Sequence, residues 1–145
     1  MIVKVKKLTN TAKLPEKGSK FSAGYDLSAD INKSILIRPK ETIKIPTGLS
    51  FEVPEGYFGG IYARSGLATK QGLRPANAVG VADADFRGEY IVALHNDSDT
   101  TRIIEPGQRI AQVVFQPYLV CELKEYDDLT QTERGSGGFG STGNK

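Results

Sequence analysis

The sequence has 145 residues, 39% of them hydrophobic, and its 19 basic and 17 acidic side chains leave a net charge of +2. This length predicts a single domain with a substantial core, and the balanced charge gives no indication of a nucleic-acid partner. The single cysteine, Cys121, excludes an intrachain disulfide and a cysteine-based zinc site, and the single histidine, His95, argues against histidine-ligated metals and a Ser–His–Asp triad.

Alternating apolar and polar residues predict short β-strands along most of the chain. In residues 49–53, for example, Leu49, Phe51 and Val53 would share one face of a strand. Glycine and proline turns recur about every eight to twelve residues, which is typical of a sandwich, a barrel or a jelly roll. The predicted strands cover residues 2–6, 35–38, 42–45, 49–53, 57–63, 78–82, 90–94, 102–104 and 109–115.

One helix is predicted, from Ser65 to Gln71, with Ser65 in the N-cap position and Gly72 as its stop. Beyond Asp127 the β pattern disappears, so we expect a β domain of residues 1–128 and a flexible C-terminal arm of residues 129–145. No stretch approaches the roughly 18 apolar residues of a membrane span, and the N-terminus lacks a signal-peptide pattern. We therefore expect a cytoplasmic protein without a membrane partner.

Two segments near the predicted helix carry side chains suited to a nucleotide. Arg64, Ser65 and Gly66 stand where a strand ends and the helix begins, and such a helix start favours a phosphate. The alternative is an ordinary capped helix with a solvated arginine. Asn77 both donates and accepts hydrogen bonds through one amide, so it could match the edge of a nucleobase, although asparagine is also frequent in turns.

Acidic residues follow the apolar run 78–82. In an extended chain Asp83 and Asp85 would project from the same face about 7 Å apart, where they could bind a hard metal or supply a general base. The alternative is an acidic turn between two strands. Asp26 supplies a carboxylate just inside a strand, and Gln112, in a strand that follows a Pro-Gly turn, is a candidate phosphate or water ligand. The alternative is that either residue is purely structural.

The segment from Arg134 to Gly143 combines glycines with an arginine, an aromatic ring and two hydroxyls. Arg134 offers a bidentate fork for phosphate, Phe139 offers a flat face for stacking, and Ser141 and Thr142 offer hydroxyl donors. These groups indicate an arm that closes over a ligand carrying phosphates and an aromatic ring. A frayed terminus is the alternative.

In their order and spacing these five segments, from about Ala23 to Gly143, resemble the five motifs of the homotrimeric dUTPases. The resemblance implies a jelly-roll β-barrel that forms a homotrimer, with each of three sites built from all three subunits. It also implies hydrolysis of dUTP to dUMP and pyrophosphate with Mg²⁺, which keeps uracil out of DNA and supplies dUMP for dTMP synthesis.

The resemblance further implies a role for each matching residue. Asp83 would orient and deprotonate the water that attacks the α-phosphorus, and Asp26 would act through water on a Mg²⁺ chelated by the triphosphate. The uracil pocket would comprise Asn77, Ala78, Val79, Gly80 and Val81. The phosphates would be held by Arg64, Ser65, Gly66 and Gln112, and the arm would add Arg134, Gly140, Ser141 and Thr142, with Phe139 stacked on uracil.

Two positions depart from the family pattern. The family usually has a tyrosine where Phe86 stands, under the deoxyribose, and often a larger aliphatic residue where Ala82 stands. Phe86 keeps the apolar platform, so we expect discrimination against UTP to persist because a 2′-hydroxyl there would be crowded or unpaired. The resemblance assigns no role to Asp85.

Three other functions remain open at this level. A dCTP deaminase, or a bifunctional enzyme that makes dUMP from dCTP, would resemble dUTPases in fold; the complete arm and Asn77 favour dUTP as the substrate. A non-catalytic binding protein on the same scaffold would not need Asp83 or the arm. A structural jelly roll with a disordered tail is the remaining alternative.

Overall fold

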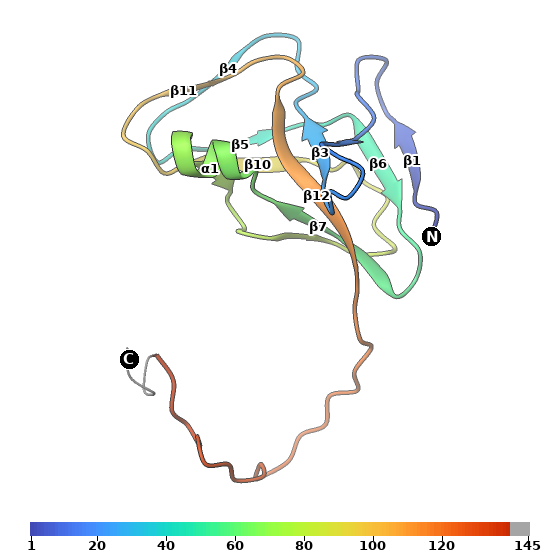
Figure 1. The fold of residues 1–145 in the computed structure, drawn as a ribbon, viewed down its shortest axis with the longest axis vertical. Helices are drawn as coiled ribbons and strands as arrows, with labels where there is room; N and C mark the ends of the chain where they lie inside the picture. Colours follow the sequence, from blue (N-terminus) through green and yellow to red (C-terminus); the bar gives the residue numbers. More distant parts are fainter. Residues whose placement is uncertain (140–145) are drawn as a thin grey trace.

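The structure is a computed structural model, and it describes residues 1–139 of the chain. Strands account for most of its regular structure, as the sequence predicted, and one short helix lies beside them (Figure 1). The elements are β1 Lys4–Lys7, β2 Glu16–Lys17, β3 Tyr25–Ser28, β4 Ile35–Ile37, β5 Thr42–Ile45, β6 Leu49–Glu52, β7 Tyr57–Tyr62, α1 Ser65–Gln71, β8 Leu73–Pro75, β9 Gly80–Ala82, β10 Val92–Asn96, β11 Arg102–Ile104 and β12 Arg109–Pro117.

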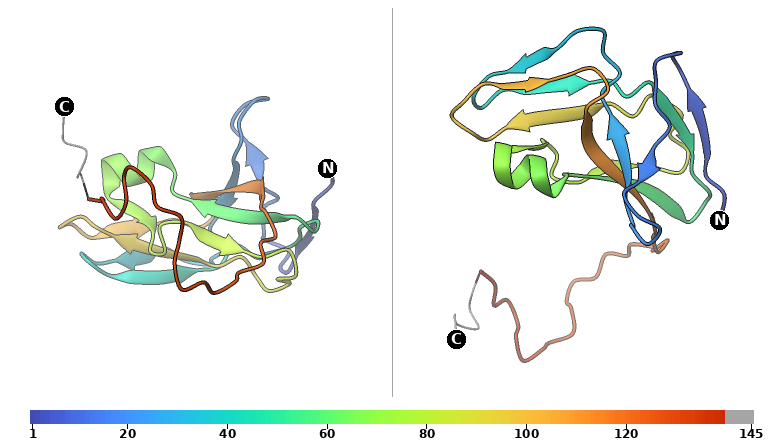
Figure 2. Two further views of the ribbon diagram at one scale, coloured as in Figure 1. Left: turned by 90° about the horizontal axis from the view of Figure 1, so that it is seen from below. Right: turned by 45° about the horizontal axis from the view of Figure 1, so that its top comes forward.

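Within residues 1–139 the strands form four antiparallel sheets. The largest has the order β2-β3-β12-β7-β9, a second has the order β5-β10-β8, and β1-β6 and β11-β4 form two-stranded ribbons. Neighbours in the sheets are mostly distant in sequence, as with β3, β12 and β7, so the chain repeatedly crosses between sheets in the manner of a jelly roll. Figure 2 shows the helix at one side of these layers.

The core lies between the sheets and contains mostly aliphatic side chains. Leu49, Phe51 and Val53 are all buried, which confirms the face predicted for their strand. The Phe51 ring packs 4.4 Å from Tyr90 and 5.9 Å from Phe115, centroid to centroid. Each such buried side chain contributes about 1.5–3 kcal/mol through removal of apolar surface from water.

Most predicted strands are confirmed, and the exceptions have local causes. The predicted strand 78–82 begins only at Gly80 because Ala78 adopts a left-handed backbone with φ of 57°. β1 begins at Lys4 and is exposed along its length, where the prediction had a half-buried strand from Ile2 to Lys6. It pairs with β6 alone among the described strands. The short strands β2 and β8 were not predicted, because β2 consists of two charged residues and β8 contains a proline, so neither shows the pattern of an apolar strand.

The helix occupies the predicted residues but begins differently. Its N-cap is Arg64, with φ of −85° and ψ of 127°, and Ser65 is the first helical residue. The prediction that Ser65 caps the helix is therefore wrong: within the described residues no side chain caps this end. Gly72 ends the helix as predicted, because its left-handed φ of 67° lets its N–H bond to the Ala68 carbonyl.

Beyond β12 the chain leaves the body of the molecule. Residues 118–139 contain no helix or strand, and they run in a long arc away from the sheets (Figures 1 and 2). Leu119, Val120 and Leu123 on this segment are 88%, 87% and 95% exposed. The regular structure thus ends at Pro117, and the proposed boundary at residue 128 stays a prediction. Within residues 1–139, no helix has the length and apolar character needed to cross a bilayer.

Candidate functional site

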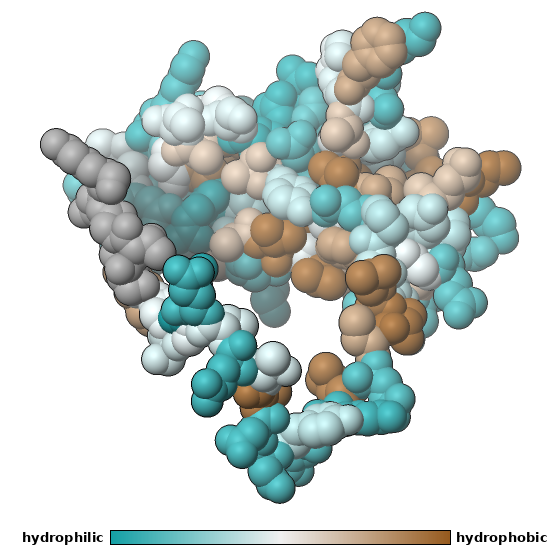
Figure 3. All heavy atoms as spheres, turned by 60° about the horizontal axis from the view of Figure 1, so that its bottom comes forward, coloured by the Kyte–Doolittle hydropathy of each residue, from teal (hydrophilic) through white to brown (hydrophobic). Residues whose placement is uncertain are grey.

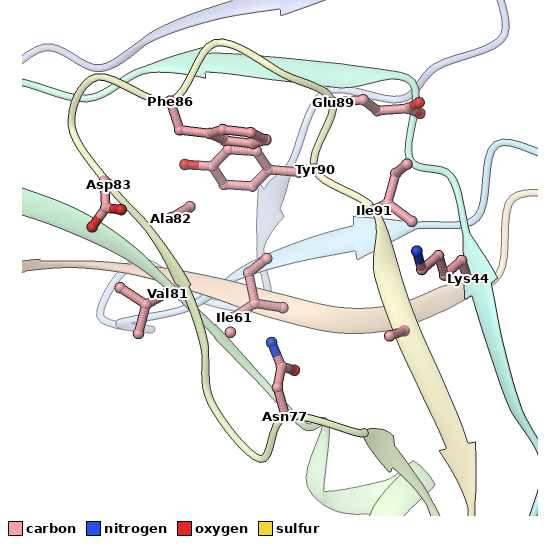
Figure 4. Close-up of a pocket in the computed structure, with 12 residues that line it drawn as sticks. Lys44, Ile61, Asn77, Val81, Ala82, Asp83, Phe86, Glu89, Tyr90 and Ile91 are labelled. Atoms are coloured by element: carbon pink, nitrogen blue, oxygen red, sulfur yellow. The ribbon is translucent and has the colours of Figure 1, made fainter.

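A cavity of about 380 Å³ lies against the loop that joins β8 to β9 (Figure 4). It brings Asn77, Gly80, Val81, Asp83 and Phe86, five of the predicted site residues, around one hollow. Seven residues that the sequence did not single out for the site complete its lining: Lys44, Ile61, Ala82, Glu89, Tyr90, Ile91 and Ala93.

The tip of this loop is shaped by its backbone. The Ala78 N–H bonds to the Pro75 carbonyl at 3.2 Å, and the left-handed φ of Ala78 turns the chain back toward β9. Gly80 then lies beneath Asn77: a Cβ at Gly80 would come 3.1 Å from the Asn77 amide nitrogen. A glycine here therefore lets the Asn77 amide lie close over the backbone, and Figure 4 shows that side chain directed toward the cavity.

Asp83 follows β9, where the chain turns. The Phe86 N–H bonds to the Asp83 carbonyl at 3.1 Å, so residues 83–86 form a turn rather than the extended segment that was assumed. The prediction of Asp83 and Asp85 on one strand face is therefore wrong. Asp83 lines the cavity, whereas Asp85 lines only a neighbouring hollow, which Asp83 and Glu55 also border.

The loop after this turn is tied to the body by its backbone carbonyls. The Ser50 hydroxyl of β6 donates to the Arg87 carbonyl at 2.7 Å, and the Arg87 guanidinium donates to the Ala84 carbonyl at 2.6 Å. Phe86 lies on the cavity side, 43% exposed, with its ring 6.0 Å from that of the buried Tyr90. The loop thus presents an apolar face beside the Asp83 carboxylate.

Tyr90 is the functional candidate that the sequence reasoning missed. It is 1% exposed, and its hydroxyl has no hydrogen-bond partner among residues 1–139. Burial raises the pKa of Tyr90 to about 12, so the phenol is protonated at neutral pH. In the sequence it stood at the start of an apolar run predicted to be a strand, and nothing in that pattern distinguished it from a core residue.

A separate hollow at the start of α1, called the polar hollow below, gathers the predicted phosphate and metal residues. Its lining includes Asp26, Arg64, Ser65, Gly66, Arg109 and Gln112. The Arg64 Nε donates to Oδ1 of Asp26 at 2.8 Å, and Arg109 Nη1 donates to Oδ2 at 3.0 Å. Asp26 therefore bridges two guanidinium groups, and Arg109 joins the site although no role was predicted for it.

Gln112 enters this hollow from the middle strand of the large sheet. It faces Asp26 on β3 and Tyr62 on β7 across the two strand pairs of β12. Its amide nitrogen donates to the Ala63 carbonyl at 2.9 Å. A Cβ at Gly24 would collide with the Gln112 amide oxygen and lie 3.0 Å from Cδ, so a glycine is required at Gly24 for this placement.

The cavity and the polar hollow share no lining residue among those the structure describes. One chain therefore brings the predicted phosphate residues together, and separately brings the predicted uracil residues to Asp83, but does not join the two groups. Arg134 and Phe139 line neither hollow: the Arg134 Nε donates to the Gly137 carbonyl at 2.9 Å, and Phe139 is fully exposed. Gly140, Ser141 and Thr142 lie outside the described residues.

The donor set suits a metal that arrives with its ligand better than a resident ion. Within residues 1–139, no three His, Cys, Asp or Glu side chains come together to hold a metal. Asp26 retains carboxylate oxygens in the polar hollow, but both already accept hydrogen bonds from arginines. Contact through water with a cation already chelated by phosphates fits this arrangement.

Comparisons with known proteins agree with this geometry. The dUTPase family model matches residues 10–143. The deoxyuridine 5′-triphosphate nucleotidohydrolase of Rickettsia bellii is 49% identical over 142 residues, with 97% of this chain and 95% of that protein covered. That of Desulfitobacterium hafniense is 47% identical over 132 residues, covering 90% and 87%. The solved dUTPase of Staphylococcus bacteriophage 80alpha, a G164S mutant with dUpNHpp, superposes with a TM-score of 0.88 at 30% identity, and 98% of each chain is covered.

Proposed function

This chain belongs to the dUTPase family, and we propose that it hydrolyses dUTP to dUMP and pyrophosphate. The observation that carries the proposal is the cavity in which an acid, Asp83, meets an apolar ring, Phe86, and the amide of Asn77. A nucleobase edge, a sugar and a reacting phosphate need these three kinds of group. The match to relatives named for the same reaction, along nearly the whole chain, supports the same conclusion.

The loop between β8 and β9 is proposed to hold the nucleoside. The uracil edge pairs with the Asn77 amide and with the backbone of Ala78, Val79, Gly80 and Val81, because both offer donors and acceptors to an imide. The Phe86 ring lies under the deoxyribose. Because that ring carries no polar atom, a ribose 2′-hydroxyl placed against it would lose its hydrogen bonds.

Asp83 is proposed as the general base. Its carboxylate orients a water molecule and takes a proton from it as the oxygen bonds to the α-phosphorus. The bond from that phosphorus to the bridging oxygen of the β-phosphate breaks, and the electron pair leaves with pyrophosphate. Phosphoryl transfer of this kind depends on positioning and charge neutralisation rather than on a covalent enzyme intermediate, so no histidine or cysteine is needed.

The polar hollow is proposed to bind the phosphates. Arg64, Ser65, Gly66 and Gln112 supply donors there. Within the described contacts Arg64 engages Asp26 through Nε, so its two terminal nitrogens remain available to an oxyanion. Asp26 would hold, through water, a Mg²⁺ bound to the triphosphate, and that ion would neutralise phosphate charge when present.

A homotrimer with shared sites would bring the cavity of one subunit next to the polar hollow of a neighbouring subunit. The apolar side chains on the extended segment after β12, visible in Figure 3, support association because isolated chains rarely expose so many in one stretch. The arm, with Arg134, Phe139, Gly140, Ser141 and Thr142, would then close over a site made largely by other subunits. The predicted cytoplasmic location stays a prediction.

The substrate assignment is tested by presenting dUTP, dCTP, dTTP and UTP with Mg²⁺ and measuring both pyrophosphate and ammonia. We expect pyrophosphate from dUTP alone and no ammonia. Ammonia from dCTP would instead indicate a deaminase, and no reaction with any nucleotide would indicate a binding protein.

The shared site is tested by mixing two inactive variants. A chain ending at Thr132 lacks the arm, and Asp83→Ala lacks the base, so each alone should have little activity. After the subunits are mixed and reassembled, some sites would combine an intact arm with an intact Asp83, and activity should reappear. If the mixture stays inactive although mixed oligomers form, the arm and Asp83 of one site come from the same chain.

A further inference from the structure

The Tyr90 hydroxyl is a buried donor without an acceptor. The residue is 1% exposed, and the oxygen has no partner among residues 1–139. The backbone of the same residue is fully used: its N–H donates to the Leu49 carbonyl at 2.8 Å, and its carbonyl accepts from the Thr47 hydroxyl at 2.6 Å. A polar group buried in this way is costly and uncommon, so the hydroxyl requires an explanation.

The ring that carries this hydroxyl is held in one position. It packs between Phe51, at 4.4 Å, and Phe86, at 6.0 Å between ring centroids. Its tip lies over Gly59, where a Cβ would come 2.8 Å from the hydroxyl oxygen. Gly59 pairs with Ala82 on β9, so two small residues together leave the space that the phenol occupies. A core phenylalanine would fill the same space without an unpaired oxygen.

The hydroxyl points toward Asp83. In Figure 4 the oxygen of Tyr90 lies at the end of the ring nearest Ala82 and Asp83, beneath Phe86. Burial is the main cause that raises the pKa of Tyr90 to about 12, and the negative charge of Asp83 adds to it. The phenol therefore keeps its proton at neutral pH, and the nearby anion is an acceptor for it.

Other charged groups around the cavity are engaged or lie elsewhere. Glu89 accepts the Gly48 N–H at 2.7 Å, and both Glu89 and Lys44 lie at the opposite end of the cavity in Figure 4. The Arg87 guanidinium donates to backbone carbonyls and favours the ionised form of Tyr90. Asp85 and Glu55 border the neighbouring hollow and do not line this cavity. Asp83 is thus the acidic group of the cavity that lies on the hydroxyl's side.

We propose that Tyr90 is a positioning residue whose hydroxyl donates a hydrogen bond to the Asp83 carboxylate, directly or through one water, once nucleotide fills the cavity. This inference rests on the proposed hydrolysis of dUTP. The bond would fix one carboxylate oxygen and leave the other aimed at the attacking water. Phe86 has no hydroxyl, so it cannot compete for the same acceptor.

The test is Tyr90→Phe, which removes one oxygen and keeps the ring. We expect kcat for dUTP to fall about tenfold, the value of one hydrogen bond to a charged group, with KM unchanged. We also expect the melting temperature of the free protein to rise, because an unpaired buried donor is removed. A merely structural tyrosine would not show lower turnover together with higher stability.

Tyr62→Phe is the matched control, because the Tyr62 hydroxyl is already bonded to the Gln116 side chain at 2.6 Å. This control should melt lower than wild type and keep its kcat. Combining Tyr90→Phe with Asp83→Asn distinguishes action through Asp83 from an independent role. If Tyr90 acts through Asp83, the double variant should turn over no more slowly than Asp83→Asn alone.

Three results would overturn the inference while leaving dUTP hydrolysis intact. The first is an unchanged kcat and KM in Tyr90→Phe. The second is a raised KM with unchanged kcat, which would place the hydroxyl on the nucleotide. The third is a full further tenfold loss of kcat when Tyr90→Phe is added to Asp83→Asn. A wild-type chain that does not hydrolyse dUTP would instead overturn the proposed function, and this inference with it.

Discussion

The carboxylate of Asp26 is bonded to the guanidinium of Arg64, with Nε 2.8 Å from Oδ1. The two residues are 38 positions apart in the sequence. They meet because β12 lies between β3, which carries Asp26, and β7, the strand that leads to Arg64. The acid expected near the metal thus orients the arginine expected on the phosphates. With Arg109 on its other oxygen, Asp26 lies at the centre of the polar hollow.

Asp26→Asn should lower stability. The Asp26 side chain is 16% exposed and that of Arg64 is 29% exposed, so the pair is partly shielded from water, and removing its negative charge leaves two guanidinium groups side by side. We expect a loss of about 1–2 kcal/mol in the free energy of unfolding, measured by urea denaturation. Glu16→Gln, on the neighbouring strand but exposed, is the control and should stay within about 0.5 kcal/mol of wild type. Equal effects of the two changes would show that the Asp26–Arg64 pair contributes nothing to the free energy of unfolding.

Gly24→Ala should impair phosphate binding with little effect on stability. A methyl group at Gly24 would collide with the Gln112 amide, which must then rotate away from the Ala63 carbonyl. We expect KM for dUTP to rise several-fold in steady-state kinetics. Gly18→Ala adds the same methyl in ordinary contact, 3.7 Å from the Ser22 hydroxyl, and should behave as wild type. A Gly24→Ala enzyme with normal KM would remove Gln112 from the phosphate site.

Phe86 should determine the choice of sugar. With the ring present, kcat/KM for dUTP should exceed that for UTP by about 100-fold or more, because a 2′-hydroxyl would lose its hydrogen bonds against the ring. Phe86→Ala should reduce that ratio about tenfold, whereas Phe86→Tyr, which keeps the platform, should preserve it. Comparable kcat/KM values for UTP and dUTP in the wild-type enzyme would contradict this role.

Tyr90 should make the fold sensitive to alkali. Its pKa is raised from 10.0 to about 12 in the folded chain. The folding free energy linked to the neutral phenol is therefore fully present below pH 10 and is lost as the pH rises toward 12. Between pH 9 and 12 wild type should therefore lose more stability than Tyr90→Phe, by at most about 2 kcal/mol. Thermal melts of both proteins across this range provide the measurement. Parallel curves would mean that the phenol ionises as easily in the folded as in the unfolded chain.

Much of the fold could be predicted from local pattern. The strand 42–45 appears at its predicted bounds as β5, and Gly72 ends the helix, because alternation and a left-handed glycine are properties of a few adjacent residues. An acidic turn at residues 83–86 was the alternative to an extended segment, and the local pattern did not decide between the two. The loop after the turn is held in part by a distant group, the Ser50 hydroxyl on the Arg87 carbonyl, and no short window of sequence contains that contact.

The site was predictable as a set of segments but not as contacts. Spacing and residue type indicated Asp26, Arg64 and Gln112, yet their mutual arrangement depends on which strands flank β12. Arg109 and Tyr90 gave no signal because an arginine at a strand start and a tyrosine in an apolar run usually serve packing or solubility. Their roles emerge only when Asp26 and Asp83 are found beside them.

The rate of pyrophosphate release by Asp83→Asn shows whether Asp83 is the base that hydrolyses dUTP. Asparagine keeps the shape of the side chain but cannot take the proton from water. With dUTP and Mg²⁺ we expect the variant to be about 10³-fold slower than wild type, with an unchanged melting temperature. A variant that releases pyrophosphate at the wild-type rate would contradict the account.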